Sequence, residues 1–272
     1  MNVLFIGGGN MGRALIGGLL AQGRAPDTIA VVEVDAAART RLQTEFAVRT
    51  EAAIERGIVA RAASIVLAVK PQHLRQTALA LASHLDAQLV ISIAAGIRIA
   101  DLSRWLGGHT RIVRVMPNTP ALIRRGIAGL FADPSVAALE RNQAEEILNA
   151  VGETLWCERE EQLDAVTAVS GSGPAYVFLF LEALIEAGRA LGFDDEQARR
   201  LAYATAGGAA ALAAQSADPP ATLRAQVTSK GGTTEAAVAV LEQRAVKAAF
   251  VAAIRAADAR AKELGDSLGK DN

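Results

Sequence analysis

The sequence predicts an α/β protein in two parts, a doubly wound parallel sheet followed by an all-α domain. Three observations indicate this fold class. Short apolar, β-branched runs alternate with amphipathic stretches up to about residue 157, the β-rich runs stop after about residue 160, and the remaining segments are helical stretches separated by small polar turns. We therefore divide the chain into residues 1–160 and residues 161–272.

The strands of the first part are nearly continuous apolar runs, which is typical of strands buried on both faces. Helices between them would supply the crossovers that parallel strands need. The runs are residues 3–6, 29–32, 64–69, 89–93 and 111–115, followed by weaker strands at 126–131 and 153–157, which are joined by a helix that Pro134 and Ser135 open.

The helices of the second part are unusually apolar. Residues 175–184 are apolar almost all the way round, and residues 202–214 have hardly any polar face, whereas a surface helix of a monomer keeps a charged stripe. We expect these helices to pack against another subunit. The alternative is that they pack on the first domain alone.

Composition and charge exclude several classes of function. With 28 Lys and Arg against 29 Asp and Glu, the net charge is −1, so the chain has no basic field for nucleic acid or an anionic membrane. The uncharged residues 201–214 are too few to span a membrane. A single cysteine, Cys157, and three scattered histidines, His73, His84 and His109, provide no metal-ligand cluster.

The N-terminus has no cationic segment of the kind that begins a secretory signal, because Arg13 is its first charged side chain. A chain with one cysteine also forms no internal disulfide. We therefore expect a soluble, cytoplasmic protein.

The turn Gly7-Gly8-Gly9-Asn10-Met11-Gly12 follows the first strand and opens a helix. In this spacing the first glycine makes a tight turn, the second lets backbone approach a pyrophosphate, and the third lets helix and strand pack closely. The phosphates then lie at the helix N-terminus. The motif predicts a Rossmann-like, dinucleotide-binding domain.

Glu33 ends the second strand and follows Gly12 by 21 residues. A carboxylate there accepts hydrogen bonds from a ribose 2′-OH and repels a 2′-phosphate, which favours NADH over NADPH. Two alternatives stay open: Glu33 is an ordinary solvated charge, or Arg39 or Arg41 meets a phosphate instead.

Three further loops follow predicted strands, and ligands of open α/β sheets bind beyond the carboxyl ends of strands. We expect these loops to line the nicotinamide crevice. The proline that follows Lys70 fixes the direction of the chain at this residue. The alternative interpretation is that Lys70 is an ordinary surface lysine whose aliphatic stem lies on apolar groups. The loops are Val69-Lys70-Pro71, Ala94-Ala95-Gly96 and Met116-Pro117-Asn118-Thr119-Pro120.

Two small, hydroxyl-rich turns open helices in the second part. They are Ser170-Gly171-Ser172-Gly173-Pro174 and Thr228-Ser229-Lys230-Gly231-Gly232-Thr233-Thr234. Each can present backbone N–H groups and hydroxyls to a small anionic substrate. The alternative for both is plain N-capping.

Taken in order, these motifs resemble the pyrroline-5-carboxylate reductase family over essentially the whole chain. The resemblance rests on residues 5–12, 69–71, 92–96, 116–120, 169–176 and 231–234. It implies hydride transfer from NADPH or NADH to the C=N bond of 1-pyrroline-5-carboxylate, giving L-proline. It also implies that the second part forms an intertwined homodimer, with rings of dimers in some members, and that the partner subunit helps to build the substrate site.

The resemblance also assigns residues to the substrate. Thr234 would hydrogen-bond the ring nitrogen, the backbone N–H groups of Gly232, Thr233 and Thr234 would hold the substrate carboxylate, and Gly231 and Ser172 would belong to the same site. Glu160 and Gln226 correspond to positions near the cofactor in relatives. The chain departs from many relatives in having Lys230 where they have proline, an acid at Glu33, and no asparagine in residues 54–57.

We expect catalysis by Thr234 and Lys70 without a strong general acid. The proposed substrate loops carry no His, Asp or Glu, and a threonine hydroxyl is a weak acid, so the imine is protonated from solvent. One rival is a β-hydroxyacid dehydrogenase, which needs a lysine that residues 164–184 lack. Another is a non-catalytic dinucleotide sensor of the same fold.

Overall fold

The computed structural model describes residues 2–270, which form two compact units. The first unit comprises the described residues up to Ser172 together with those from Ala257 onward, and the second is Gly173–Ala256. The strands of the first unit are β1 (Val3–Ile6), β2 (Ile29–Val32), β3 (Arg49–Glu51), β4 (Ser64–Leu67), β5 (Leu89–Ser92), β6 (Ile112–Met116), β7 (Gly126–Ala132) and β8 (Gly152–Trp156).

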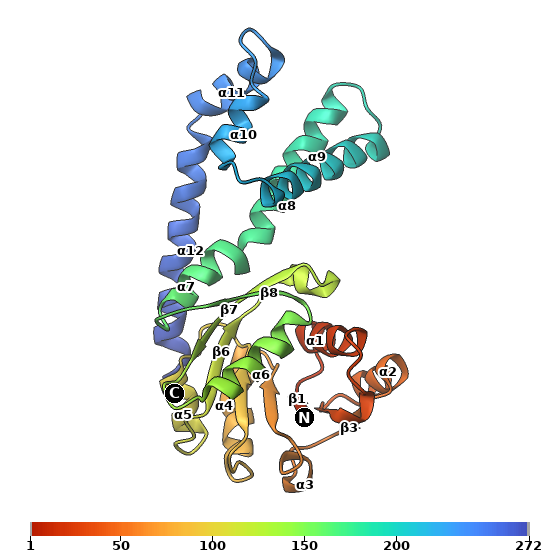
Figure 1. Cartoon of the computed structure of the whole chain (residues 1–272), viewed down its shortest axis with the longest axis vertical. Coiled ribbons are helices and arrows are strands. Elements are labelled where there is room, and N and C mark those ends of the chain that lie inside the picture. The colour runs from red at the N-terminus through yellow and green to blue at the C-terminus, as the bar shows by residue number, and fades with distance from the viewer. Residues whose placement is uncertain (1, 271–272) are drawn as a thin grey trace. The chain divides into compact units, whose positions relative to one another are not determined.

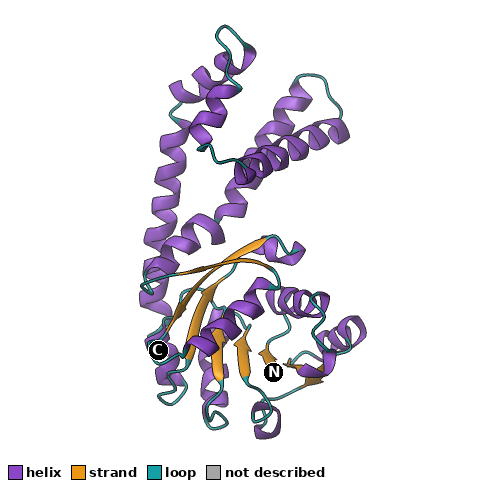
Figure 2. Ribbon diagram, in the orientation of Figure 1, coloured by secondary structure: helices purple, strands orange, loops and turns teal. Residues whose placement is uncertain are grey.

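These strands form one sheet in the order β3-β2-β1-β4-β5-β6-β7-β8. The pairs are parallel except that of β6 with β7, where Val113 lies opposite Ala132 and Met116 opposite Gly129. The predicted doubly wound α/β fold is confirmed (Figure 2). Two details differ from the sequence prediction: β3 was not predicted, since it is three residues long and polar, and β7 runs against its neighbour β6.

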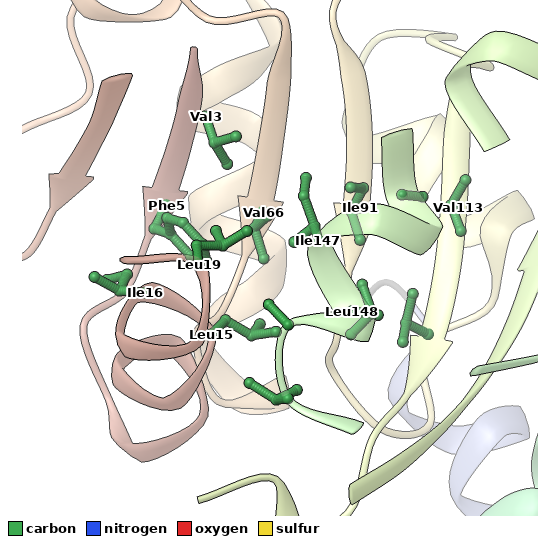
Figure 3. Close-up of a cluster of buried hydrophobic side chains, with 14 of the residues drawn as sticks. Val3, Phe5, Leu15, Ile16, Leu19, Val66, Ile91, Val113, Ile147 and Leu148 are labelled. Carbon is green, nitrogen blue, oxygen red and sulfur yellow. The ribbon is translucent and has the colours of Figure 1, made fainter. Parts of the chain in front are cut away.

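Helices cover the sheet on both faces, and each face has its own apolar core. On one face, Phe5 and Val66 pack against Leu15 and Leu19 of α1 and Ile147 of α6 (Figure 3). The helices of this face are α1 (Asn10–Ala21), α2 (Ala36–Phe46) and α6 (Ala138–Asn149), and those of the other are α3 (Arg56–Val59), α4 (Pro71–Ala82) and α5 (Ile99–Trp105).

After β8 the chain becomes helical, as predicted. α7 (Gln162–Val166) leads through a π-helical turn (Thr167–Gly171) to α8 (Gly173–Ala190), and the later helices are α9 (Asp195–Gln215), α10 (Pro220–Gln226), α11 (Thr233–Gln243) and α12 (Val246–Leu268) (Figure 1). The division after residue 160 into functional domains stays a prediction. By compactness, α7 and the π-helical turn belong with the sheet.

The end of α12 also belongs with the sheet unit. Arg98 Nη2 donates to Asp266 Oδ1 at 2.7 Å, and Arg104 Nη2 donates to the Gly269 carbonyl oxygen at 2.7 Å. A Cβ atom added to Gly96 would lie 2.9 Å from Leu268 Cδ1. The chain therefore leaves the sheet unit after Ser172 and returns to it at Ala257.

The second unit buries very little of its own apolar surface. Among its described residues, the buried hydrophobic side chains are Ala198 and Ala202. Large side chains lie exposed on α8, α9, α11 and α12, among them Phe178, Leu179, Leu212, Leu241 and Val251. The stretch Gln162–Ala190 is long and apolar enough to cross a membrane by length and composition alone. Exposed apolar surface of this extent is typical of an interaction surface.

Candidate active site

The glycine turn after β1 is closed so tightly that two of its positions accept no side chain. Gly7 has a φ of +102°, and a Cβ atom there would lie 2.6 Å from the Ala68 carbonyl oxygen. A Cβ atom on Gly12 would lie 2.7 Å from the Gly7 carbonyl oxygen. The first and third glycines of the motif therefore have the packing roles that their spacing predicts.

Gly9, the middle glycine, has a different environment. It is exposed, and a Cβ atom added to it would meet no protein atom within 4 Å. Its φ of −69° and ψ of −175° are accessible to any residue. Nothing in the protein requires glycine here, so the absence of a side chain leaves room for a ligand at the N-terminus of α1.

Glu33 lies beside this turn at the end of β2. Its Oε2 accepts a hydrogen bond from the Gly8 backbone N–H at 2.8 Å, and its Oε1 accepts one from the Asp35 N–H at 3.0 Å. Each carboxylate oxygen keeps a further lone pair for a hydroxyl donor. Glu33 thus orders the glycine turn and remains able to bind a ribose.

A cleft of about 920 Å³ opens at this edge of the sheet. Of the predicted cofactor residues, its lining includes Gly7, Gly9, Asn10, Glu33, Val69 and Lys70. Its volume is in the range of small-molecule and cofactor sites. The open space at Gly9, the free end of α1 and the Glu33 acceptors fit a dinucleotide: the α1 N-terminus would hold the pyrophosphate and Glu33 the adenosine ribose.

The charges near Glu33 include one that the sequence analysis missed. Asp35 also lines the cleft, and hydrogen bonds from the Ala38 and Ala37 backbone N–H groups lower the pKa of its carboxyl, so it is ionised at neutral pH. Its position three residues after β2 and two beyond Glu33 could have identified it as a second acid at this strand end. Of the two arginines weighed, Arg41 lines the cleft. Arg39 Nη1 instead donates to the carbonyl oxygens of Glu33 at 2.7 Å and Val34 at 2.9 Å.

The loops after β5 and β6 lie at the same sheet edge but are not part of the lining of this cleft. Ala94, Ala95 and Gly96 follow β5, and Met116, Pro117 and Asn118 end or follow β6, the neighbouring strand. Pro71 begins α4, while Met11 and Gly12 lie within α1. The cofactor roles of these residues stay predictions.

A buried ion cluster lies beneath the β6 loop. The Arg114 side chain, 5% exposed, donates from Nη1 to Glu160 Oε1 at 3.0 Å, and its Nη2 is 3.5 Å from Asp164 Oδ1. Glu160 Oε1 also accepts from the Ile99 backbone N–H at 2.8 Å. Glu160 thus joins β6 to the start of α5, which is a structural role that no sequence pattern revealed.

The predicted substrate residues are divided between the two units. Ser172 belongs to the first unit, and Gly231, Gly232, Thr233 and Thr234 lie at the N-terminus of α11 in the second. The Gly232 N–H donates to the Ser229 carbonyl oxygen at 3.0 Å, and the Gly231 N–H donates to Glu235 Oε2 at 2.7 Å. Because these two N–H groups are taken within the loop, an anion at this helix end would bind the N–H groups of Thr233 and Thr234.

The second unit also has an apolar groove of about 980 Å³ along α11 and the start of α12. Its lining is mainly aliphatic, with Val238, Leu241, Val246, Ala248 and Val251. The groove extends the exposed apolar surface of this unit.

Comparisons with known proteins cover nearly the whole chain. A family model described as "Pyrroline-5-carboxylate reductase dimerisation" matches residues 160–264, and one described as "NADP oxidoreductase coenzyme F420-dependent" matches residues 2–96. The pyrroline-5-carboxylate reductase of Pseudomonas aeruginosa is 47% identical over 270 residues, covering 98% of this chain and 98% of the relative.

Solved structures agree with these matches. A pyrroline-5-carboxylate reductase from Coxiella burnetii is similar with a TM-score of 0.92 and 42% identity, over 97% of this chain and 98% of that one. Plasmodium falciparum pyrroline carboxylate reductase with NADP bound is similar with a TM-score of 0.86 and 28% identity, over 97% of this chain and 98% of that one.

We predict that Gly9→Ala weakens binding of NADH and NADPH by about tenfold or more, because a methyl group there intrudes where backbone approaches the pyrophosphate. The substitution costs less than about 1 kcal/mol in the free energy of unfolding, since its main penalty is a poorer N-cap. Fluorescence titration and chemical denaturation measure the two quantities. Gly57→Ala, at another position where a Cβ atom meets nothing within 4 Å, is the control. Unchanged affinity in Gly9→Ala would contradict the assignment.

Proposed function

The chain belongs to the pyrroline-5-carboxylate reductase family, and we propose that it transfers hydride from a reduced nicotinamide cofactor to the C=N bond of 1-pyrroline-5-carboxylate, giving L-proline. The observation that carries this proposal is the free space at Gly9, where an added Cβ atom would meet no protein atom within 4 Å. The reductase relative from Pseudomonas aeruginosa matches 98% of the chain in which this space lies. When bound, the cofactor supplies the hydride.

The chain's own residues would bind and orient the substrate. The N–H groups of Thr233 and Thr234, at the positive end of α11, hold the substrate carboxylate, with Gly231, Gly232 and Ser172 completing the site. The Thr234 hydroxyl orients the ring nitrogen, which takes its proton from solvent. Lys70, exposed at the cleft, adds positive charge beside the reacting groups. Rate acceleration then comes mainly from positioning two bound reactants.

For the cofactor we propose a preference for NADH over NADPH. Glu33 and Asp35 place two carboxylates at the cleft end where the adenosine ribose would bind, and a 2′-phosphate there meets like charge. Of Arg39 and Arg41, only Arg41 lines the cleft, and its positive charge opposes this preference because it would attract a 2′-phosphate. The solved relative with NADP bound shows that its own site accepts the phosphorylated cofactor.

We propose a homodimer as the functional unit. Two copies would cover the apolar faces of α8 and α9 and the groove along α11, which one chain leaves exposed. A ring of dimers would be a further assembly of the same unit. A buried, free Cys157 is consistent with a cytoplasmic enzyme.

The reductase activity predicts oxidation of NADH and of NADPH when 1-pyrroline-5-carboxylate is added, with the faster initial rate for NADH at equal subsaturating concentrations. The two reactions are followed by the loss of cofactor absorbance. Faster turnover with NADPH would overturn the proposed preference and keep the reductase. No turnover with either cofactor would favour the dinucleotide sensor.

Glu33→Gln tests the selecting carboxylate, because it removes the charge and keeps an oxygen for the Gly8 N–H. We predict that the ratio of kcat/KM for NADPH to that for NADH rises about tenfold, equivalent to ~1.4 kcal/mol. Glu153→Gln, an exposed acid on β8, is the control. An unchanged ratio in Glu33→Gln would assign the selection to another group.

Thr234→Ala removes the hydroxyl proposed to orient the ring nitrogen. We predict a turnover roughly 10 to 100-fold lower, corresponding to one positioned hydrogen bond worth ~1.5–3 kcal/mol. Thr234→Ser keeps the hydroxyl and retains much of the rate. Equal kcat in the wild type and Thr234→Ala would remove Thr234 from the mechanism.

A further inference from the structure

The side-chain amide of Asn118 is bonded to the protein on both sides. Its Nδ2 donates to the Ser170 carbonyl oxygen at 3.3 Å, and its Oδ1 accepts from the Ile127 backbone N–H at 3.0 Å. The residue is 9% exposed. An amide that turned toward a ligand would leave a donor or an acceptor of the surrounding backbone unpaired, which is costly in a buried position.

These two bonds join three elements of the sheet unit. Asn118 lies in the loop after β6, Ile127 lies in β7, and Ser170 belongs to the π-helical turn. Turns of this kind are rare and occur frequently at functional sites. Here the turn directly precedes Ser172, where the chain leaves the sheet unit, and Ser172 is one of the proposed substrate residues.

The π-helical turn makes a second contact, with Met116 at the end of β6. The residue of the turn at this contact is Gly171, which has no side chain. A Cβ atom added to Gly171 would lie 2.5 Å from Met116 Cε, so the Met116 side chain lies directly against the turn. Farther down the same strand, Arg114 is paired with Glu160 and Asp164 at the start of the same helical segment. The end of β6 and its loop are therefore held to this segment at three successive places.

We propose that Asn118 is a positioning residue for the reduction: its amide fixes the loop after β6 against the π-helical turn and does not bind the cofactor. The proposal rests on the proposed function, because it concerns how a reacting geometry is held. The loop after β6 is one of those predicted to line the nicotinamide crevice, so loosening it would displace groups there. The proposed adenosine and pyrophosphate sites at Glu33 and Gly9 follow other strands and would be untouched. The rate of hydride transfer should therefore depend on Asn118 more strongly than the affinity for the cofactor does. A small displacement of the reacting groups lowers the rate by a large factor.

Two variants separate the two bonds, and a third is a control. Asn118→Ala removes both, whereas Asn118→Asp keeps an acceptor for the Ile127 N–H and loses the donor to the Ser170 carbonyl oxygen. Asn142→Asp, an exposed asparagine on α6, is the matched control for the added charge. We expect kcat to fall about 10 to 100-fold in Asn118→Ala and Asn118→Asp. The Kd of NADH, measured by fluorescence titration, should stay within about threefold of the wild type.

Protonation provides a rescue that a merely structural defect would not show. In Asn118→Asp, lowering the pH protonates a carboxyl whose pKa burial raises, and its O–H again donates to the Ser170 carbonyl oxygen. The ratio of its kcat to that of the wild type at the same pH should therefore rise as the pH falls. The same ratio for Asn142→Asp should stay flat.

The outcomes are distinct. A Kd for NADH raised tenfold or more with kcat retained would make Asn118 a cofactor ligand and overturn the positioning role. Retained kcat in Asn118→Ala, or a flat kcat ratio for Asn118→Asp, would overturn it as well. A wild type that does not reduce 1-pyrroline-5-carboxylate would overturn the proposed function itself, and the positioning role with it.

Discussion

The close approach of backbone to backbone at the end of β1 is the constraint on which the arrangement of helix and loops at this edge of the sheet depends. Gly7 is so near the Ala68 carbonyl, and Gly12 so near the Gly7 carbonyl, that a single added carbon atom would overlap an oxygen. This contact fixes α1 against β1 and β4. With α1 fixed, its free N–H groups face the cleft, and the carboxyl ends of β4, β5 and β6 present their loops along the same edge.

The sequence predicted most of the fold because buried parallel strands have a strong local signature, namely uninterrupted apolar runs. It missed β3, since Arg49, Thr50 and Glu51 look like a loop and become a strand through pairing with β2. The sequence analysis also left the direction of β7 open, although the nine residues between Met116 and Gly126 are fewer than a parallel crossover needs.

The candidate site was predictable to the extent that its chemistry follows from spacing along the chain. The glycine turn and Glu33 have such a spacing. Three partners of Arg114 and Asn118, namely Glu160, Asp164 and Ser170, lie 46 to 52 residues farther along the chain, where no periodicity connects them. Likewise, the apolarity of α8 and α9 indicated that a covering surface is needed, but the groove along α11 emerged only from the packing of helices.

The return of α12 to the sheet unit has a consequence for how the protein is made. Residues 173–256 are in effect an insertion in the sheet unit, because Arg98 and Arg104 of that unit bond to Asp266 and Gly269 near the very end of the chain. Synthesis proceeds from the N-terminus, so these contacts form only after residues 173–256 have been made. The sheet unit begins first in the sequence, but it is completed only after the second unit has been synthesised.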